Sequence, residues 1–256
     1  NPASVPMQEI YTTYSTLDST SYSAEYVYFY CTSRSFSSKA VYIPDTVKML
    51  IVNNASTVNL TGVYFDIAES EKPLIIHFNS VSALTIKAPV NISVINSSRD
   101  IVLNCKGIVS LYGGNGIDNE FYVDLDGDSA ICAHNNTVVL NGAGTLKLYG
   151  GDGGDTYGQE FYNIDPAGNG GTAIEVKNLV INVGGIYIKG GAGGNGGVGT
   201  QGSHGVDGIT AGANGTDGGN GGYGGDGGSA GMGVWVLGNY CAIYTTNIQI
   251  YGGGAG

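Results

Sequence analysis

Hydrophobic and polar positions alternate along much of the chain, and this alternation predicts β-strands. Between Tyr26 and Cys31, tyrosine occupies every second position and Val, Phe and Cys fill the positions between, so this strand presents a different set of side chains on each face. Short β-branched runs follow, separated by Asn, Ser, Asp or Pro: Val47–Val52, Val58–Phe65, Leu74–Phe78, Ala83–Ile86, Val90–Ile95 and Ile101–Leu103. Because no window has the spacing of an amphipathic helix, we expect an all-β protein, either a β-sandwich or a solenoid.

Repeats in the second half of the chain favour the solenoid. Residues 104–114, 141–151 and 182–191 share a β-run, Asn-x-x-Gly, an alternating strand and Gly-Gly, and residues 245–256 form a looser copy. Segments 127–133, 170–176 and 229–236 also resemble one another. A sandwich explains the alternation but not this shared register, so we expect a parallel β-helix. Its stacked positions would be an asparagine ladder and two apolar ladders: Asn104, Asn141 and Asn182; Leu146, Ile186 and Ile248; Leu148, Ile188 and Ile250.

Glycine divides the chain sharply near residue 107. Gly62 is the one glycine before that point, although the chain contains 45. From Gly190 to Gly208, and again from Gly212 to Gly227, glycine occupies every third position. Period three is typical of extended polyproline-II-type helices, and the absence of proline from this tract argues against collagen. We expect two arms packed as polyglycine-II-like helices beside the solenoid; the alternative is a flexible linker.

Two of these patterns resemble known proteins. The Gly170–Ile174 sequence, Gly-Gly-Thr-Ala-Ile, and its partners look like the GGAI-type repeats of parallel β-helix surface proteins. The period-three tract resembles the polyglycine-II bundles of some phage tail-tip adhesins and antifreeze proteins. The resemblance covers at most residues 107–256 and lacks an FxxN partner motif. It implies an extracellular structural or recognition role and transfers no catalytic residues.

The chain is expected to have three parts. Residues 1–45 form a Ser/Thr/Tyr-rich arm and the first strands, residues 46–112 the β-solenoid coils, and residues 113–256 coils with glycine-rich insertions. The last copy of the repeat ends without an evident cap, so the natural chain continues or another subunit covers this end. We expect the arm or the first coil to pack on the open C-terminal coil of a neighbour, which would give head-to-tail growth. A start at Asn1 rather than Met fits a processed, secreted form.

Composition and charge exclude several partners. Ten basic residues stand against 21 acidic ones, for a net charge of −11. Nucleic acids and anionic membrane surfaces are bound through clustered Lys and Arg, so we expect neither partner. No apolar run is long enough for a membrane span.

Candidate modification and metal sites are scattered along the chain. Four cysteines lie far apart in the sequence and predict one or two disulfides or buried thiols: Cys31, Cys105, Cys132 and Cys241. Six Asn-x-Ser/Thr sequons are candidates for N-glycosylation: Asn54, Asn59, Asn91, Asn96, Asn135 and Asn214. Asp124, Asp126 and Asp128 could offer oxygens to Ca²⁺, but a solvated acidic loop is the competing interpretation, and we otherwise expect no cofactor.

The residues do not indicate an enzyme. His77, His134 and His204 lie on separate segments, and Arg34 and Arg99 lack an acidic pair of the kind that polysaccharide lyases and hydrolases cluster on one strand face. We therefore expect an extracellular, self-assembling filament or appendage subunit. The alternative is a surface adhesin that binds glycans, and a polysaccharide lyase is less favoured.

Overall fold

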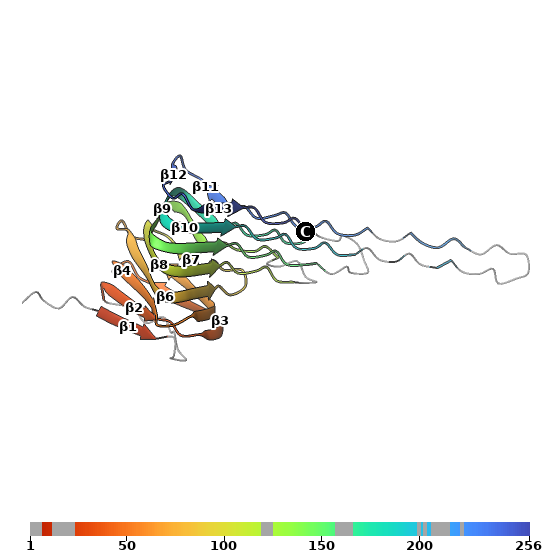
Figure 1. Cartoon of the computed structure of the whole chain (residues 1–256). Coiled ribbons are helices and arrows are strands. Elements are labelled where there is room, and N and C mark those ends of the chain that lie inside the picture. The colour runs from red at the N-terminus through yellow and green to blue at the C-terminus, as the bar shows by residue number, and fades with distance from the viewer. Residues whose placement is uncertain are drawn as a thin grey trace, which may run out of the picture.

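The computed structural model describes residues 7–11, 24–118, 125–156, 166–198, 201, 204–205, 216–220 and 223–256. These residues are all-β, with one parallel sheet (Figure 1). Within them, no helix is long and apolar enough to cross a membrane. The thirteen strands of this part of the chain are β1 Met7–Tyr11, β2 Tyr26–Tyr30, β3 Arg34–Ile43, β4 Met49–Asn54, β5 Val58–Ile67, β6 Leu74–Lys87, β7 Ile95–Ser97, β8 Ile101–Tyr112, β9 Ile131–Tyr149, β10 Ile174–Lys189, β11 Val234–Val236, β12 Cys241–Ile243 and β13 Ile248–Tyr251.

Period-two alternation places one side of nearly every strand in a common core. In β4 and β6 buried residues alternate with partly exposed ones along most of the strand. Their inward side chains join one apolar cluster that runs from Val27 to Ile188. Burial of these aliphatic and aromatic side chains, at about 1.5–3 kcal/mol each, is the main force that holds the strands together.

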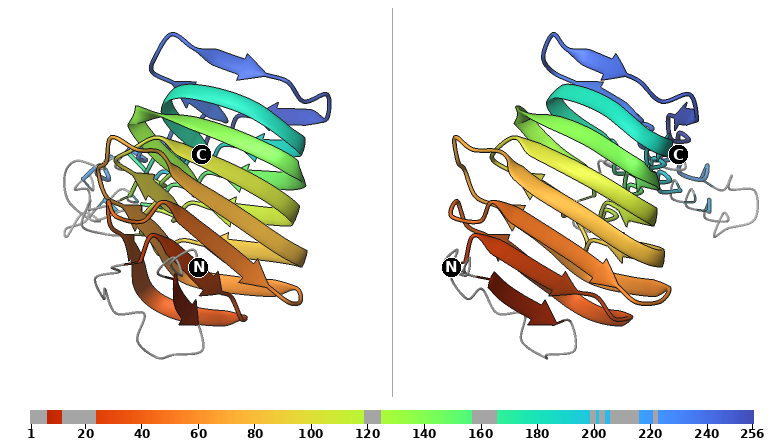
Figure 2. Two further views of the ribbon diagram at one scale, coloured as in Figure 1. Left: turned by 90° about the vertical axis from the view of Figure 1, so that its left-hand side faces the viewer. Right: turned by 60° about the vertical axis from the view of Figure 1, so that its left-hand side comes forward.

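The strand pairings close on themselves, which corrects the predicted architecture. β5 pairs with β6, β6 with β8, β8 with β9, β9 with β7 and β7 with β5, all in parallel. This is a closed five-stranded parallel barrel. β4, β2 and β1 continue from β6, β3 lies on β5, and β10 to β13 continue from β9 (Figure 2). The parallel β-helix solenoid that the repeats predicted is therefore wrong, because a period-two pattern and a repeat do not specify which strand lies beside which.

Long, bent strands make this closure possible. β9 is long enough to pair with three strands, β7, β8 and β10, and its pairing with β10 shifts register twice. Gly107 and Gly142 have φ of +77° and +110°, and a Cβ at either would lie 2.4 or 2.3 Å from a carbonyl oxygen of the adjacent strand. Only glycine adopts this backbone conformation at no cost. The strands therefore turn at these positions, while β8 keeps β6 and β9 as partners and β9 keeps β8 and β10 on both sides of the turn.

The glycine-rich segments leave the strand body from one side and run in one direction (Figure 1). They follow β8, β9, β10 and β13, so the register of these strands places the segments beside one another. Much of the period-three tract, including residues 206–215, lies outside the described residues, as do residues 1–6 and 12–23 of the arm. Of the arm, Met7–Tyr11 pairs with β2 of its own chain.

Candidate functional site

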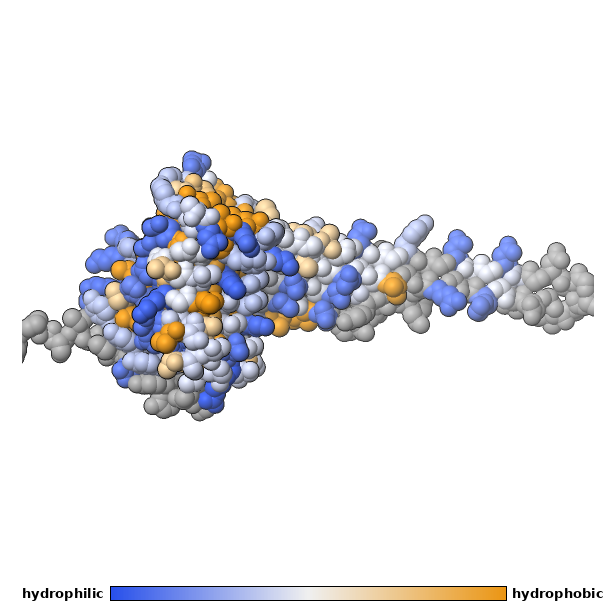
Figure 3. Space-filling model, viewed as in Figure 1, coloured by the Kyte–Doolittle hydropathy of each residue, from blue (hydrophilic) through white to orange (hydrophobic). Residues whose placement is uncertain are grey.

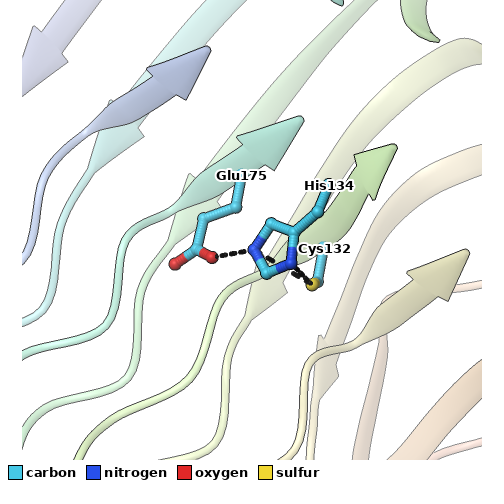
Figure 4. Close-up of side chains that lie close together, drawn as sticks. All are labelled: Cys132, His134 and Glu175. Carbon is cyan, nitrogen blue, oxygen red and sulfur yellow. Dashed lines mark hydrogen bonds and ion pairs between the residues drawn. The ribbon is translucent and has the colours of Figure 1, made fainter. Parts of the chain in front are cut away.

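A cysteine, a histidine and a glutamate meet on the outer face of two adjacent strands (Figure 4). Cys132 and His134 are two residues apart on β9, so their side chains leave the same face. β10 lies parallel to β9 with Glu175 opposite Cys132. The strand register alone therefore brings the three side chains together, without a loop.

The three side chains are close enough to bind one metal ion together. Their ligand atoms all lie within 4.8 Å of one another. His134 Nε2 donates to Glu175 Oε2 over 2.5 Å, and Cys132 Sγ lies 3.9 and 3.8 Å from His134 Nδ1 and Nε2. Cys132 is half-buried, whereas His134 is exposed, so the site is open to solvent on one side.

Electrostatics keep the thiol in its neutral form. Burial, followed by the negative charges of Glu175 and Asp128, raises the pKa of Cys132 to about 11. A nucleophilic cysteine needs a lowered pKa, so that the thiolate is present near neutrality. The cluster therefore does not resemble a cysteine-histidine catalytic pair, and its chemistry is that of a donor set.

The single tryptophan of the chain adjoins the cluster. Trp235 on β11 lies opposite Glu175 on β10, and its ring meets that of His134 edge-on at 6.5 Å between centroids. From the sequence, Cys132 is only a candidate for a disulfide or a buried thiol, and His134 lies on a different segment from the other two histidines. The resemblance among segments 127–133, 170–176 and 229–236 could have predicted that Cys132, Glu175 and Trp235 are neighbours, because these residues occupy the same position in the three segments.

The two described calcium candidates, Asp126 and Asp128, accept hydrogen bonds from the protein. Asp126 Oδ1 accepts a hydrogen bond from the Asn169 backbone N–H at 2.7 Å. Asp128 Oδ1 accepts from Ser93 Oγ and from the Ser129 N–H. Asp124 lies outside the described residues. The two described carboxylates accept hydrogen bonds from nearby donors, and the Ca²⁺ site stays a prediction.

Carboxylates and amides of the glycine-rich segments play the same structural part as Asp126. Asp152 Oδ1 accepts from the Ala192 N–H at 2.8 Å, and Asp155 Oδ1 accepts from the Asn195 N–H at 2.7 Å. Each side chain thereby binds the backbone of the neighbouring segment. Hydrogen bonds to an ionised acceptor are stronger than neutral ones, so these acidic residues help to fix the segments side by side.

The sequons differ in their exposure. Asn59, Asn96 and Asn135 are exposed, and Asn91 is partly exposed with φ of +53°. Asn54 is only 3% exposed, and its Nδ2 donates to the carbonyls of Ser56 and Ala83. A glycan on Asn54 would break both bonds. Asn214 lies outside the described residues.

All four cysteines carry free thiols, so the structure joins no two of them in a disulfide. Cys31 and Cys105 are buried in the core, while Cys241 is exposed. Burial raises the pKa of Cys105 to about 12 and that of Cys31 still further. The histidines are equally dispersed: His77 is partly exposed on β6, and His204 is exposed in a glycine-rich segment.

The last three strands form an apolar surface that the sequence did not reveal. β11, β12 and β13, which we call the end layer, each pair with β10 and with no other described strand. Their exposed large hydrophobic residues, with those of the adjoining turns, gather at this end of the strand body (Figure 3): Met232, Trp235, Leu237, Tyr240, Ile243, Tyr244, Ile250 and Tyr251. Exposed apolar patches of this kind are typical of interaction surfaces.

Comparisons of the chain with protein families, with curated proteins and with solved structures found no match. Two features of the described residues bear on function: the end layer and the Cys132–His134–Glu175 cluster.

Proposed function

We propose that the chain is an extracellular structural protein whose copies join head to tail through the end layer. One observation carries the proposal. Ile243 and Ile250 lie opposite Ile181 and Ile188 of β10, and these two β10 side chains are fully buried, whereas Ile243 and Ile250 are 45% and 42% exposed. The rows of inward apolar side chains therefore continue from β10 into the end layer, where these side chains are exposed.

The strand directions favour head-to-tail contact over a symmetric pair. All strands are parallel, and β1 and β3 at the opposite end pair only with β2 and β5 among the described strands. A second copy shifted along the strand-stacking direction would present these edges to the end layer in the same parallel sense. A contact between two different surfaces does not close, and it produces filaments. Free strand edges are ready templates for such pairing.

The exposed sequons, and not the assembly, support an extracellular setting. Asn59, Asn96 and Asn135 are exposed sequons, as N-glycosylation requires. The net charge of −11 argues against nucleic acid as a partner.

The assembly is tested by sedimentation and negative-stain electron microscopy of the full chain. Ile243→Lys together with Tyr244→Lys places two charges on the end layer, where burial against a neighbour would cost several kcal/mol. We expect filaments from the wild type and monomers from the double variant. The matched control, Val81→Lys, changes an exposed valine outside the end layer and should leave the filaments intact.

Two results would overturn the proposal. A wild type that sediments as a monomer at every concentration shows that the end layer does not bind a second copy. A particle that stops at two subunits shows a symmetric contact between end layers instead of head-to-tail growth.

A second function, glycan binding, is favoured by an aromatic column beside a polar hollow. The column runs from strand to strand through Tyr112, Tyr149, Tyr187 and Tyr251. The first two rings are stacked with 4.2 Å between centroids, and the next two pairs are tilted, with centroids 5.4 and 5.5 Å apart. Next to them lies a hollow of 470 Å³, whose lining includes Lys87, Asp152 and Lys189 as well as Tyr112 and Tyr149. Aromatic walls with a few polar groups are typical of small-ligand sites. Binding on a glycan array by the monomeric double variant would separate this function from assembly.

A further inference from the structure

We propose that Cys132, His134 and Glu175 form a binding site for a divalent transition metal, with Zn²⁺ as the fitting ion. The inference stands apart from the assembly proposal, because it depends on β9 and β10 and not on a second copy. Three protein ligands leave a fourth position of a tetrahedral ion to water.

The donor set selects the class of metal. A thiolate, an imidazole and a carboxylate are the three ligand types of zinc sites in proteins. Calcium and magnesium prefer sites made of oxygen atoms alone, so one oxygen ligand beside sulfur and nitrogen disfavours them. Soft and borderline donors together favour Zn²⁺ and its neighbours in the transition series.

The spacing of the donor atoms fits such an ion. With Zn–S of about 2.3 Å and Zn–N of about 2.0 Å, tetrahedral geometry separates sulfur and nitrogen by about 3.5 Å. Cys132 Sγ lies 3.8 Å from His134 Nε2, close to that separation. Glu175 Oε2 now accepts a hydrogen bond from Nε2, and this pair would open slightly as the metal takes the place of the proton.

The backbone under the site is already fixed. Ile131–Ala133 and Ile174–Val176 are paired in register, and the buried faces of both strands belong to the core. Cys132 and Glu175 therefore need only side-chain rotation to meet the ion, and His134 directly follows the paired stretch, where the register with β10 shifts. Preorganised ligands of this kind lose little conformational entropy on binding.

The local charge also attracts a cation. Glu175 is a ligand, and Asp128 is close enough for its charge to act on the Cys132 thiol. Binding transfers the thiol proton of Cys132 to solvent as the metal–sulfur bond forms, because a coordinated thiol ionises. No other reactant is needed.

The test uses Co²⁺ as a spectroscopic probe on the full chain, followed by Zn²⁺ competition. Co²⁺ ligated by Cys132 gives a thiolate-to-cobalt charge-transfer band, and it quenches the fluorescence of Trp235, the single tryptophan, whose ring meets His134. We expect saturable binding of one equivalent, which Zn²⁺ displaces.

Matched variants locate the site. Cys132→Ser, His134→Gln and Glu175→Gln should each weaken Co²⁺ and Zn²⁺ binding about tenfold or more, and Cys132→Ser should abolish the charge-transfer band. Cys241→Ser and His77→Gln remove an exposed thiol and a partly exposed imidazole elsewhere, and they should leave the affinity unchanged. Far-UV circular dichroism confirms that each variant is folded, and exposed His134 is the substitution that disturbs packing least.

Three results would overturn the inference. The first is a wild type that binds neither ion. The second is cobalt binding without a thiolate band. The third is a folded His134→Gln variant whose affinity equals that of the His77→Gln control.

Discussion

The strand body and the glycine-rich segments are held together in different ways. In the strand body, inward side chains such as Phe29 and Phe65, whose rings meet edge-on at 5.6 Å, fill a continuous core. The glycine-rich segments are instead held together by backbone hydrogen bonds. An unbroken relay of N–H to carbonyl bonds links Gly253 to Gly231, Gly231 to Gly191, Gly191 to Gly171, Gly171 to Gly151, Gly151 to Asp128, and Asp128 to Gly114.

The absence of side chains is what makes the second mode possible. A Cβ on Gly191 would lie 1.8 Å from the Gly151 carbonyl oxygen, and one on Gly171 would lie 2.3 Å from that of Asp128. The segments approach until their own backbones satisfy each other's polar groups, which a lone extended chain leaves to water. One chain therefore combines cohesion through burial of apolar surface with cohesion through backbone contact.

The largest effect is expected in the strand body. Phe65→Ala removes a fully buried ring and should lower the free energy of unfolding by about 3–5 kcal/mol. Chemical denaturation measures the change. Tyr64→Ala, on the opposite face of the same strand, is the control and should cost clearly less, because that side chain is only partly buried. Equal losses at the two positions would contradict the assigned core face.

A methyl group should be enough to break the backbone contact. Gly191→Ala pushes the segment away from Gly151, so the amides of the glycine relay should exchange with solvent at least about tenfold faster. Core strands such as β6 should keep their protection. Gly254→Ala is the control, because a Cβ there meets nothing within 4 Å. If both variants exchange like the wild type, the close packing of the segments is refuted.

The cysteines should rank by burial in their reaction with iodoacetamide. Exposed Cys241 should react first. The pKa of Cys132 is raised from 9.0 to about 11, so at pH 8 it has about a hundredfold less thiolate than a thiol of pKa 9.0. Cys132 should therefore react slowly, and its rate should rise with pH. Buried Cys105 and Cys31 should react only on unfolding. Mass spectrometry of the alkylated peptides gives the order, and early labelling of Cys105 would contradict the fold.

The smallest effect is expected at the asparagine ladder. Asn141 Nδ2 donates to Asn104 Oδ1, and Asn182 Nδ2 donates to Asn141 Oδ1, both at 3.1 Å. Asn141→Ala removes both bonds and should lower the free energy of unfolding by about 1–2 kcal/mol. Denaturation in urea measures it, with Asn239→Ala, at an exposed turn, as the control. A neutral result would show that the ladder adds no stability.

Local features were predictable from the sequence because repetition reports which residues share a position. The asparagine ladder is confirmed, and so is the pairing of Leu146 with Ile186 and of Leu148 with Ile188. The predicted architecture was wrong, because the alternation and the repeats do not specify that β7 joins β5 to β9 and so closes the barrel. The metal-ligand cluster was missed, although the aligned segments contained it, because Cys132 was considered as a disulfide partner only.

Amide hydrogen exchange, resolved by residue, tests most directly whether backbone contact holds the glycine-rich segments. The structure predicts that Gly151, Gly171, Gly191 and Gly231, whose N–H groups all donate within the relay, exchange as slowly as core amides of β9 and β10. Exchange of these glycines at the rate of an unfolded chain, with β9 and β10 still protected, would contradict it.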